Sequence, residues 1–117
     1  MLPVLARAKL AYKQWVILHR NFPRTERYGM GTKIDILLLE LLDLLRKAAY
    51  VQRDQKIKLL ESALDKIDSL RFFIQLSWEL QAISNKQFNN LGGTIEEIGK
   101  MLGGWKKSII TKTSAIR

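Results

Sequence analysis

Apolar side chains recur at alternating intervals of three and four along most of the chain, which is the spacing of one face of an α-helix. The most regular run lies in the last third and comprises Phe88, Leu91, Ile95, Ile98, Leu102, Trp105 and Ile109. A run near the N-terminus comprises Leu5, Ala8, Tyr12, Trp15, His19 and Phe22. Polar or proline-containing breaks divide the pattern into four helices, expected at about 2–22, 25–50, 54–83 and 85–108, with a frayed tail at 109–117.

Four helices with short connections in 117 residues are typical of a single all-α domain, folded as an up-down-up-down four-helix bundle. Ser84 and Gln87 have the spacing of a capping box, which predicts a fresh helix start. Asp54 is expected to cap the third helix. Thr32 is expected to cap the second, with Thr25 as an earlier alternative.

Two helix faces predict association with further copies of the chain. Residues 34–50 are apolar over more than one face, which leaves Leu37 and Leu44 toward a second side where another subunit is expected. Gly92, Gly99 and Gly103 share one face of the last helix. Glycine costs about 1 kcal/mol against alanine in a helix interior, so this face suggests close approach by a neighbour. The alternative is that the glycines at 103 and 104 end the helix.

The net charge of +9 is concentrated at the two ends of the sequence. Residues 1–33 carry +6, residues 34–84 carry −1 and residues 85–117 carry +4. The first and last helices are neighbours in such a bundle, so a basic surface is expected there, and nucleic acid is its commonest partner. The candidate contacts to nucleic acid or a polymerase are Arg7, Lys9, Lys13, Arg20, Arg71, Lys106 and Lys107. The alternative for each is a solvated surface cation.

The composition argues against an enzyme. The chain has no cysteine and one histidine, His19, which excludes the common zinc sites and the paired Glu-x-x-His motifs of a di-iron bundle. No nucleophile–base pair can be assembled, and the inward positions are apolar. We therefore expect no catalytic residue, no cofactor, no metal and no small-molecule substrate. Acidic residues interrupt the apolar stretch at 34–50, so no membrane span is expected, and the protein is predicted to be cytoplasmic.

Two stretches resemble known families. The segment Asn21-Phe22-Pro23-Arg24-Thr25-Glu26-Arg27-Tyr28-Gly29 resembles the FP-x-x-ERYG corner of a four-helix-bundle superfamily that includes proteins encoded in ribosomal-RNA intervening sequences. Those proteins usually continue with a Ser-Ile-Pro-Ser-Asn-type segment, which residues 36–41 replace here. The second resemblance is to the accessory variability determinant family of diversity-generating retroelements. It rests on Leu70-Arg71-Phe72-Phe73, Trp78-Glu79-Leu80, Ser84-Asn85-Lys86-Gln87, Ile98-Gly99 and Met101-Leu102-Gly103-Gly104-Trp105.

The second resemblance implies a homopentameric barrel of four-helix bundles with a basic surface. It also implies association with the retroelement's reverse transcriptase and with its template RNA; DNA is a further expected partner. In this association the protein would support mutagenic complementary-DNA synthesis. Two alternatives stay open. One is a ribosomal-RNA intervening-sequence-type bundle with a nucleic-acid-binding or scaffold role, and the other is a plain oligomeric scaffold or membrane-surface protein.

Overall fold

The structure, a computed structural model, describes the backbone of residues 3–116 and the side chains of residues 3–112. Its elements in chain order are α1 (Pro3–Arg20), α2 (Arg24–Glu26), the π-helical segment η1 (Arg27–Gly31), α3 (Thr32–Ala48), α4 (Arg53–Glu79) and α5 (Asn85–Ile116). The described part contains no strand. The predicted all-α four-helix bundle is therefore confirmed for the single chain.

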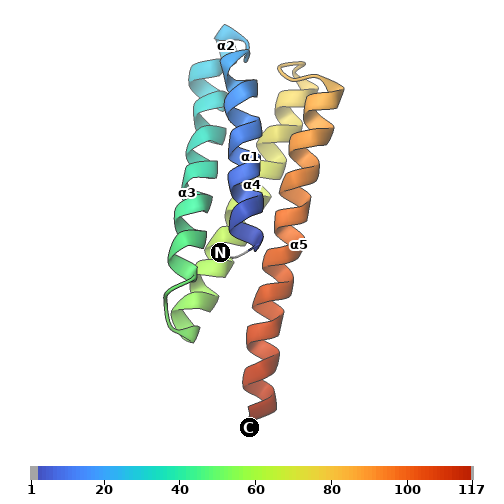
Figure 1. The fold of residues 1–117 in the computed structure, drawn as a ribbon. Helices are drawn as coiled ribbons and strands as arrows, with labels where there is room; N and C mark the ends of the chain where they lie inside the picture. The colour runs from blue at the N-terminus through green and yellow to red at the C-terminus, as the bar shows by residue number, and fades with distance from the viewer. Residues whose placement is uncertain (1–2, 117) are drawn as a thin grey trace.

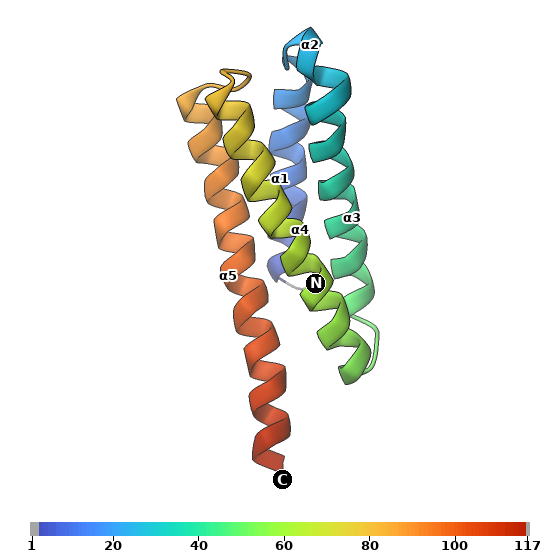
Figure 2. The ribbon, with the colours of Figure 1, turned by 180° about the vertical axis from the view of Figure 1, so that it is seen from behind.

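The four long helices form a ring in which each packs on two others. α1 contacts α3 and α5, and α4 closes the ring by contacting the same two helices. Figure 1 shows α1 in front, between α3 and α5, and Figure 2 shows α4 on the reverse side. The first and last helices are neighbours, as the topology of such a bundle requires. Within residues 3–116, no helix is both long and apolar enough to cross a membrane.

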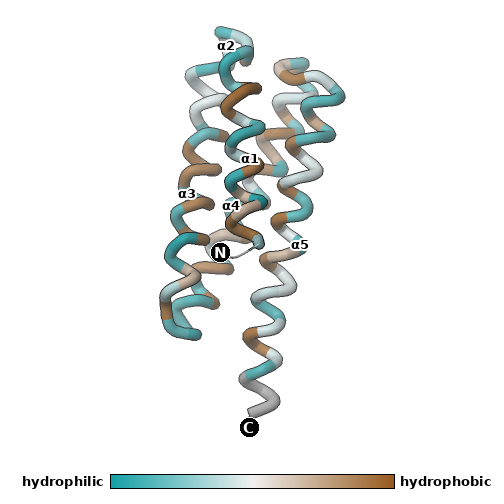
Figure 3. The backbone as a smooth tube through the Cα atoms, in the orientation of Figure 1, coloured by the Kyte–Doolittle hydropathy of each residue, from teal (hydrophilic) through white to brown (hydrophobic). Residues whose placement is uncertain are grey.

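One apolar core runs through the bundle, and every long helix contributes to it. Figure 3 shows hydrophobic positions recurring along each of these helices. Its largest fully buried side chains include Trp15, Phe22, Leu38, Leu41, Leu60, Ile67, Leu70, Ile74, Leu91 and Ile95. The predicted inward face of α1 was partly wrong. Leu5, Tyr12 and His19 are only half-buried, whereas Ala11 and Leu18 are buried instead. The observed inward face is rotated relative to the predicted one, because Tyr12 and His19 lie at the boundary between α1 and α3.

Ser84 caps α5 as predicted. Its Oγ accepts a hydrogen bond from the backbone N–H of Gln87 at 3.1 Å, and the Gln87 side chain accepts one from the backbone N–H of Ser84 at 2.9 Å. The other two caps were wrong. Asp54 pairs with Arg53 just inside α4, which has no side-chain cap. Thr32 continues from η1: its N–H and its hydroxyl both donate to the Arg27 carbonyl, and α3 has no side-chain cap.

Two helix ends differ from the expectation. α4 ends at Glu79, because Gln81 takes a left-handed conformation (φ 61°) and the Ala82 N–H bonds back to the Ser77 carbonyl. α5 does not fray after residue 108 but continues as a helix to Ile116. Ile109 still packs against the core, so the apolar face that holds the helix extends past the glycines. Residues 2 and 117 of the expected ranges lie outside the described residues.

Candidate nucleic-acid interface

The cationic excess of the chain lies on α1 and α5. α1 carries four Lys or Arg residues and no acid, whereas the charges of α3 and of α4 cancel. Because α1 and α5 pack side by side, their charges occupy adjoining surfaces of the bundle. The segment-by-segment charge of the sequence thus becomes a charge asymmetry in space. Such an asymmetry attracts polyanions.

Lys9, Lys13 and Arg20 form one stripe along α1, which we call the α1 stripe. Their spacings of four and seven place them within ~40° of arc and along ~16 Å of helix. All three are exposed, on the side of α1 opposite its buried Ala8 and Trp15. Among the side chains that the structure describes, none of the three has an acidic partner within salt-bridge distance. Their positive charge therefore remains available.

Three of the other predicted contacts are engaged by acids of neighbouring helices. Arg7 Nε lies 2.8 Å from Glu97 Oε2, which joins α1 to α5. Lys106 Nζ lies 3.3 Å from Glu61 Oε2, which joins α5 to α4. These pairs are partly exposed, so each contributes little stability, on the order of 0–1 kcal/mol. They nevertheless neutralise the charges that a phosphate would meet.

Arg71 is held in the same way, at the junction of α4 and α5. Its guanidinium contacts Glu96 Oε1 at 2.6 Å and Asp68 Oδ1 at 2.9 Å. It also lies over Gly99, where an added Cβ would come within 2.7 Å of Arg71 Nη2. The guanidinium of Arg71 is therefore engaged by contacts inside the chain.

A second stripe lies on the outer face of α5 and was only partly predicted. Lys86, Lys100 and Lys107 are exposed and have no acidic partner among the described side chains. Only Lys107 was expected. The spacings of fourteen and seven keep all three within ~60° of arc on α5. This heptad spacing, which is readable in the sequence, is the signal that could have found the α5 stripe.

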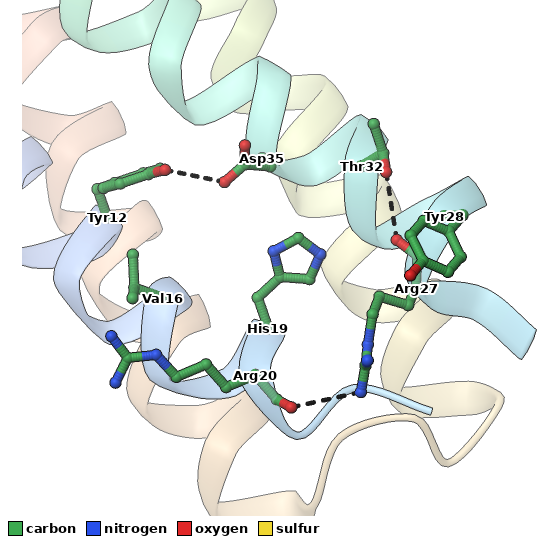
Figure 4. Close-up of a pocket in the computed structure, with 8 residues that line it drawn as sticks. All are labelled: Tyr12, Val16, His19, Arg20, Arg27, Tyr28, Thr32 and Asp35. Carbon is green, nitrogen blue, oxygen red and sulfur yellow. Dashed lines mark hydrogen bonds between the residues drawn. The ribbon is translucent and has the colours of Figure 1, made fainter. Parts of the chain in front are cut away.

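The upper end of the α1 stripe meets a pocket where α1 turns into α3, which we call the corner pocket. Its volume is about 600 Å³. Figure 4 shows its lining, with Tyr12, Val16, His19 and Arg20 from α1 on one side. The other side comes from η1 and the start of α3, and consists of Arg27, Tyr28, Thr32 and Asp35.

A set of hydrogen bonds between α1, η1 and α3 fixes the shape of this corner. Asp35 Oδ1 accepts from the Tyr12 hydroxyl at 3.0 Å and from the buried Trp15 Nε1 at 3.2 Å. Burial, and then the hydrogen bond to Asp35, raises the pKa of Tyr12 above its usual value of 10.0. Arg27 Nη2 donates to the carbonyls of Arg20 (3.3 Å) and Phe22 (3.0 Å). A cation at these carbonyls is favourable because they form the negative end of the α1 dipole.

The predicted oligomer surfaces are mostly used within the chain. Leu37 is buried in the core, and Leu44 packs against it, so the second side of α3 faces α4 rather than solvent. Gly99 is buried beneath Arg71. Gly92 and Gly103 stay half-exposed, and an added Cβ at Gly103 would meet nothing within 4 Å. Leu44, Gly92 and Gly103, which are half-exposed, are the members of this set left able to approach another copy.

Other site types find no support in the described residues. No group of three or more His, Asp or Glu side chains there is placed to hold a metal ion. His19 stacks on Trp15, with ring centroids 4.9 Å apart, beside the buried Phe22. The single histidine thus lies in an aromatic cluster at the wall of the corner pocket.

Comparisons with known proteins agree with this picture of the fold. The model of the bAvd-like family matches residues 6–109. A protein of unknown function from the S23 ribosomal protein family of Bacteroides thetaiotaomicron has a similar crystal structure, with a TM-score of 0.82 and 20% sequence identity. The similarity covers 89% of this chain and 98% of that one. A comparison with curated proteins gives no significant match.

Proposed function

Because the chain belongs to the bAvd-like family of accessory variability determinant proteins, we propose that it is a non-catalytic accessory protein of a diversity-generating retroelement. In this role it binds the element's reverse transcriptase and template RNA. It supports mutagenic complementary-DNA synthesis, while the polymerase performs the chemistry. The protein acts in the cytoplasm as a homo-oligomer, with a pentamer as the expected state.

The observation that carries the RNA-binding part is the α1 stripe. Three cations without acidic partners project from one face of a helix that contains no acid. A polyanion laid along this face gains by releasing condensed counterions, and the gain depends on the number of phosphates neutralised rather than on base sequence. The α5 stripe adds further cations on the adjoining helix. We therefore expect binding that is sensitive to salt and weakly selective for sequence.

A triple neutralisation tests this surface. In the variant Lys9→Gln/Lys13→Gln/Arg20→Gln, three phosphate contacts are lost. The slope of log affinity against log salt is then expected to fall by about 2 for single-stranded RNA, at about 0.7 per contact. The measurement is fluorescence anisotropy of a labelled RNA between about 50 and 200 mM salt.

The matched control removes the same charge elsewhere. The variant Arg46→Gln/Lys47→Gln/Lys58→Gln has the same net charge as the first, and all three residues are exposed on α3 and α4. We expect its salt slope to stay near that of the wild type. Equal slopes for the two variants would mean that net charge alone drives binding, and the proposed surface would be wrong.

Co-expression with the reverse transcriptase tests the polymerase contact and separates two candidate roles. The fold of this chain is shared with the S23-family protein, so a ribosomal-RNA-associated role is the second candidate. Co-purification that survives nuclease treatment would support direct contact with the polymerase. Co-purification lost on nuclease treatment would leave RNA binding as the shared link. Failure to co-purify in both conditions would reject the retroelement role and favour the ribosomal-RNA alternative.

A further inference from the structure

Tyr28 is a large aromatic side chain left almost wholly in solvent at the rim of the corner pocket. It is 79% exposed and lies on the π-helical segment η1. A ring that buries so little against its own chain adds little to the stability of the fold. Exposed aromatic side chains beside cations are the usual platforms on which unpaired nucleic-acid bases stack.

Two arginines against one aspartate give this pocket a net positive lining. The Arg27 guanidinium is held in place by the two carbonyls at the end of α1. The Arg20 side chain has no acidic partner among the described residues. Asp35 is an acid in the lining, and its Oδ1 already accepts from Tyr12 and Trp15. The two arginines still outnumber this one carboxylate, so the lining keeps a net positive charge that can attract a phosphate.

The pocket wall also contains polar atoms that the chain does not satisfy. Among the described residues, three buried side-chain polar atoms lack a hydrogen-bond partner. Two of them, His19 Nε2 and Arg27 Nε, belong to residues that line this pocket. Native structures satisfy most such groups, so an exception calls for an explanation, such as a water or an ion that completes the hydrogen bonds. Two exceptions at one pocket single out this corner from the rest of the bundle.

We propose that the corner pocket binds one unpaired nucleotide of an RNA strand, with its base stacked on Tyr28 and its phosphate at Arg20. The inference rests on the proposed RNA binding and adds a preference for single-stranded RNA. Arg20 belongs both to the α1 stripe and to the pocket, so a strand that follows the stripe arrives at Tyr28. A base within a duplex keeps both faces stacked on its neighbours and has no face free for the tyrosine.

The test compares a single-stranded RNA with a duplex of the same length. For Tyr28→Ala, affinity for the single strand is expected to fall about 5- to 150-fold, the range for loss of one stacked base, while duplex affinity stays within about 2-fold. Tyr28→Phe keeps the ring and is expected to bind as the wild type does. Because Tyr28 is exposed, its removal leaves the core intact.

Tyr50 provides the matched control. It is 87% exposed in the α3–α4 connection, at the opposite end of the bundle from the corner (Figure 1). Tyr50→Ala removes an equally exposed ring and is expected to change neither affinity. An equal loss in the two alanine variants would overturn the assignment of the nucleotide to the corner pocket.

The remaining outcomes separate this inference from the proposed function. If the wild type binds no RNA at low salt, the proposed function fails. If binding is salt-dependent but unchanged in Tyr28→Ala, only the pocket inference fails. If adenosine monophosphate binds in a Tyr28-dependent way while RNA binding ignores Tyr28, the pocket serves a free nucleotide and the RNA assignment is overturned. If Tyr28→Ala loses the reverse transcriptase but keeps RNA, the corner is a protein contact and the inference is again overturned.

Discussion

Replacing Gly103 with alanine is expected to stabilise the single chain. Gly103 lies inside α5, and a Cβ added there meets nothing within 4 Å. Alanine at an unstrained helix-interior position is favoured over glycine by about 0.8–1 kcal/mol, partly because the unfolded chain loses conformational freedom. We therefore expect Gly103→Ala to raise the free energy of unfolding by about 0.5–1 kcal/mol. At this chain length the midpoint of thermal unfolding would rise by about 2–6 °C.

Gly99→Ala is the internal comparison, because the same change meets a packed neighbour. An added Cβ would lie 2.7 Å from Arg71 Nη2 and 3.3 Å from Ile67 Cγ2. The flexible guanidinium can move away, but it would leave two exposed ion pairs worth about 0–1 kcal/mol each. Ile67 is fully buried and has little room to move. These losses offset the gain in helix propensity, so Gly99→Ala is expected to be neutral or destabilising.

Urea unfolding followed by far-UV circular dichroism measures the difference between the two variants. The expected result is a higher midpoint for Gly103→Ala than for Gly99→Ala, with an unchanged denaturant slope. Protein concentration is held constant, because self-association adds to apparent stability. A lower midpoint for Gly103→Ala, by an amount that grows with protein concentration, would refute the reasoning. It would assign Gly103 to the close contact between copies that the glycine spacing in the sequence predicted.

Further predictions concern the corner and the cap of α5. Asp35→Ala should lower the free energy of unfolding, measured in urea, by about 1–3 kcal/mol, because the buried Trp15 Nε1 loses its acceptor. Asp35→Asn keeps an acceptor oxygen and should retain much of this stability. Burial and the bond to Asp35 raise the pKa of Tyr12, so stability present below pH 10 should fall as the pH rises through the raised value. In Tyr12→Phe, the urea midpoint should not show this fall above pH 10. Ser84→Ala should cost about 1 kcal/mol in thermal unfolding, and an unchanged midpoint would contradict the capping box.

The sequence predicted features whose cause is local or periodic. Ser84 and Gln87 form a capping box because both partners lie within one turn of each other. Asp54 and Thr32 have similar local patterns and are not caps, since capping depends on where the helix begins. In α3 the π-helical segment η1 already supplies the partner for the Thr32 N–H. A residue-type pattern does not contain that information.

Contacts between distant residues were beyond the sequence pattern. Arg7 and Glu97 are ninety positions apart, and their pairing follows only from the register of α1 against α5. The same holds for Gly99, whose partner Arg71 lies on the preceding helix. Periodicity indicated that these residues lie near the core boundary. It could not indicate whether they face a neighbour in the same chain, a second copy or a nucleic acid.

The ion pairs explain how a modest excess of cations can give a directed positive surface. Both acids of α5, Glu96 and Glu97, are engaged by arginines of the flanking helices, Arg71 and Arg7. These ion pairs neutralise the acids of α5 at the edges of the helix that face α1 and α4. The outward lysines of α5 are therefore left without counter-charges on their own helix, and α1 has no acid of its own. Reversing Glu97 to lysine would release Arg7 and add charge at the α1–α5 boundary. RNA affinity should then rise even though no cation of either stripe has changed.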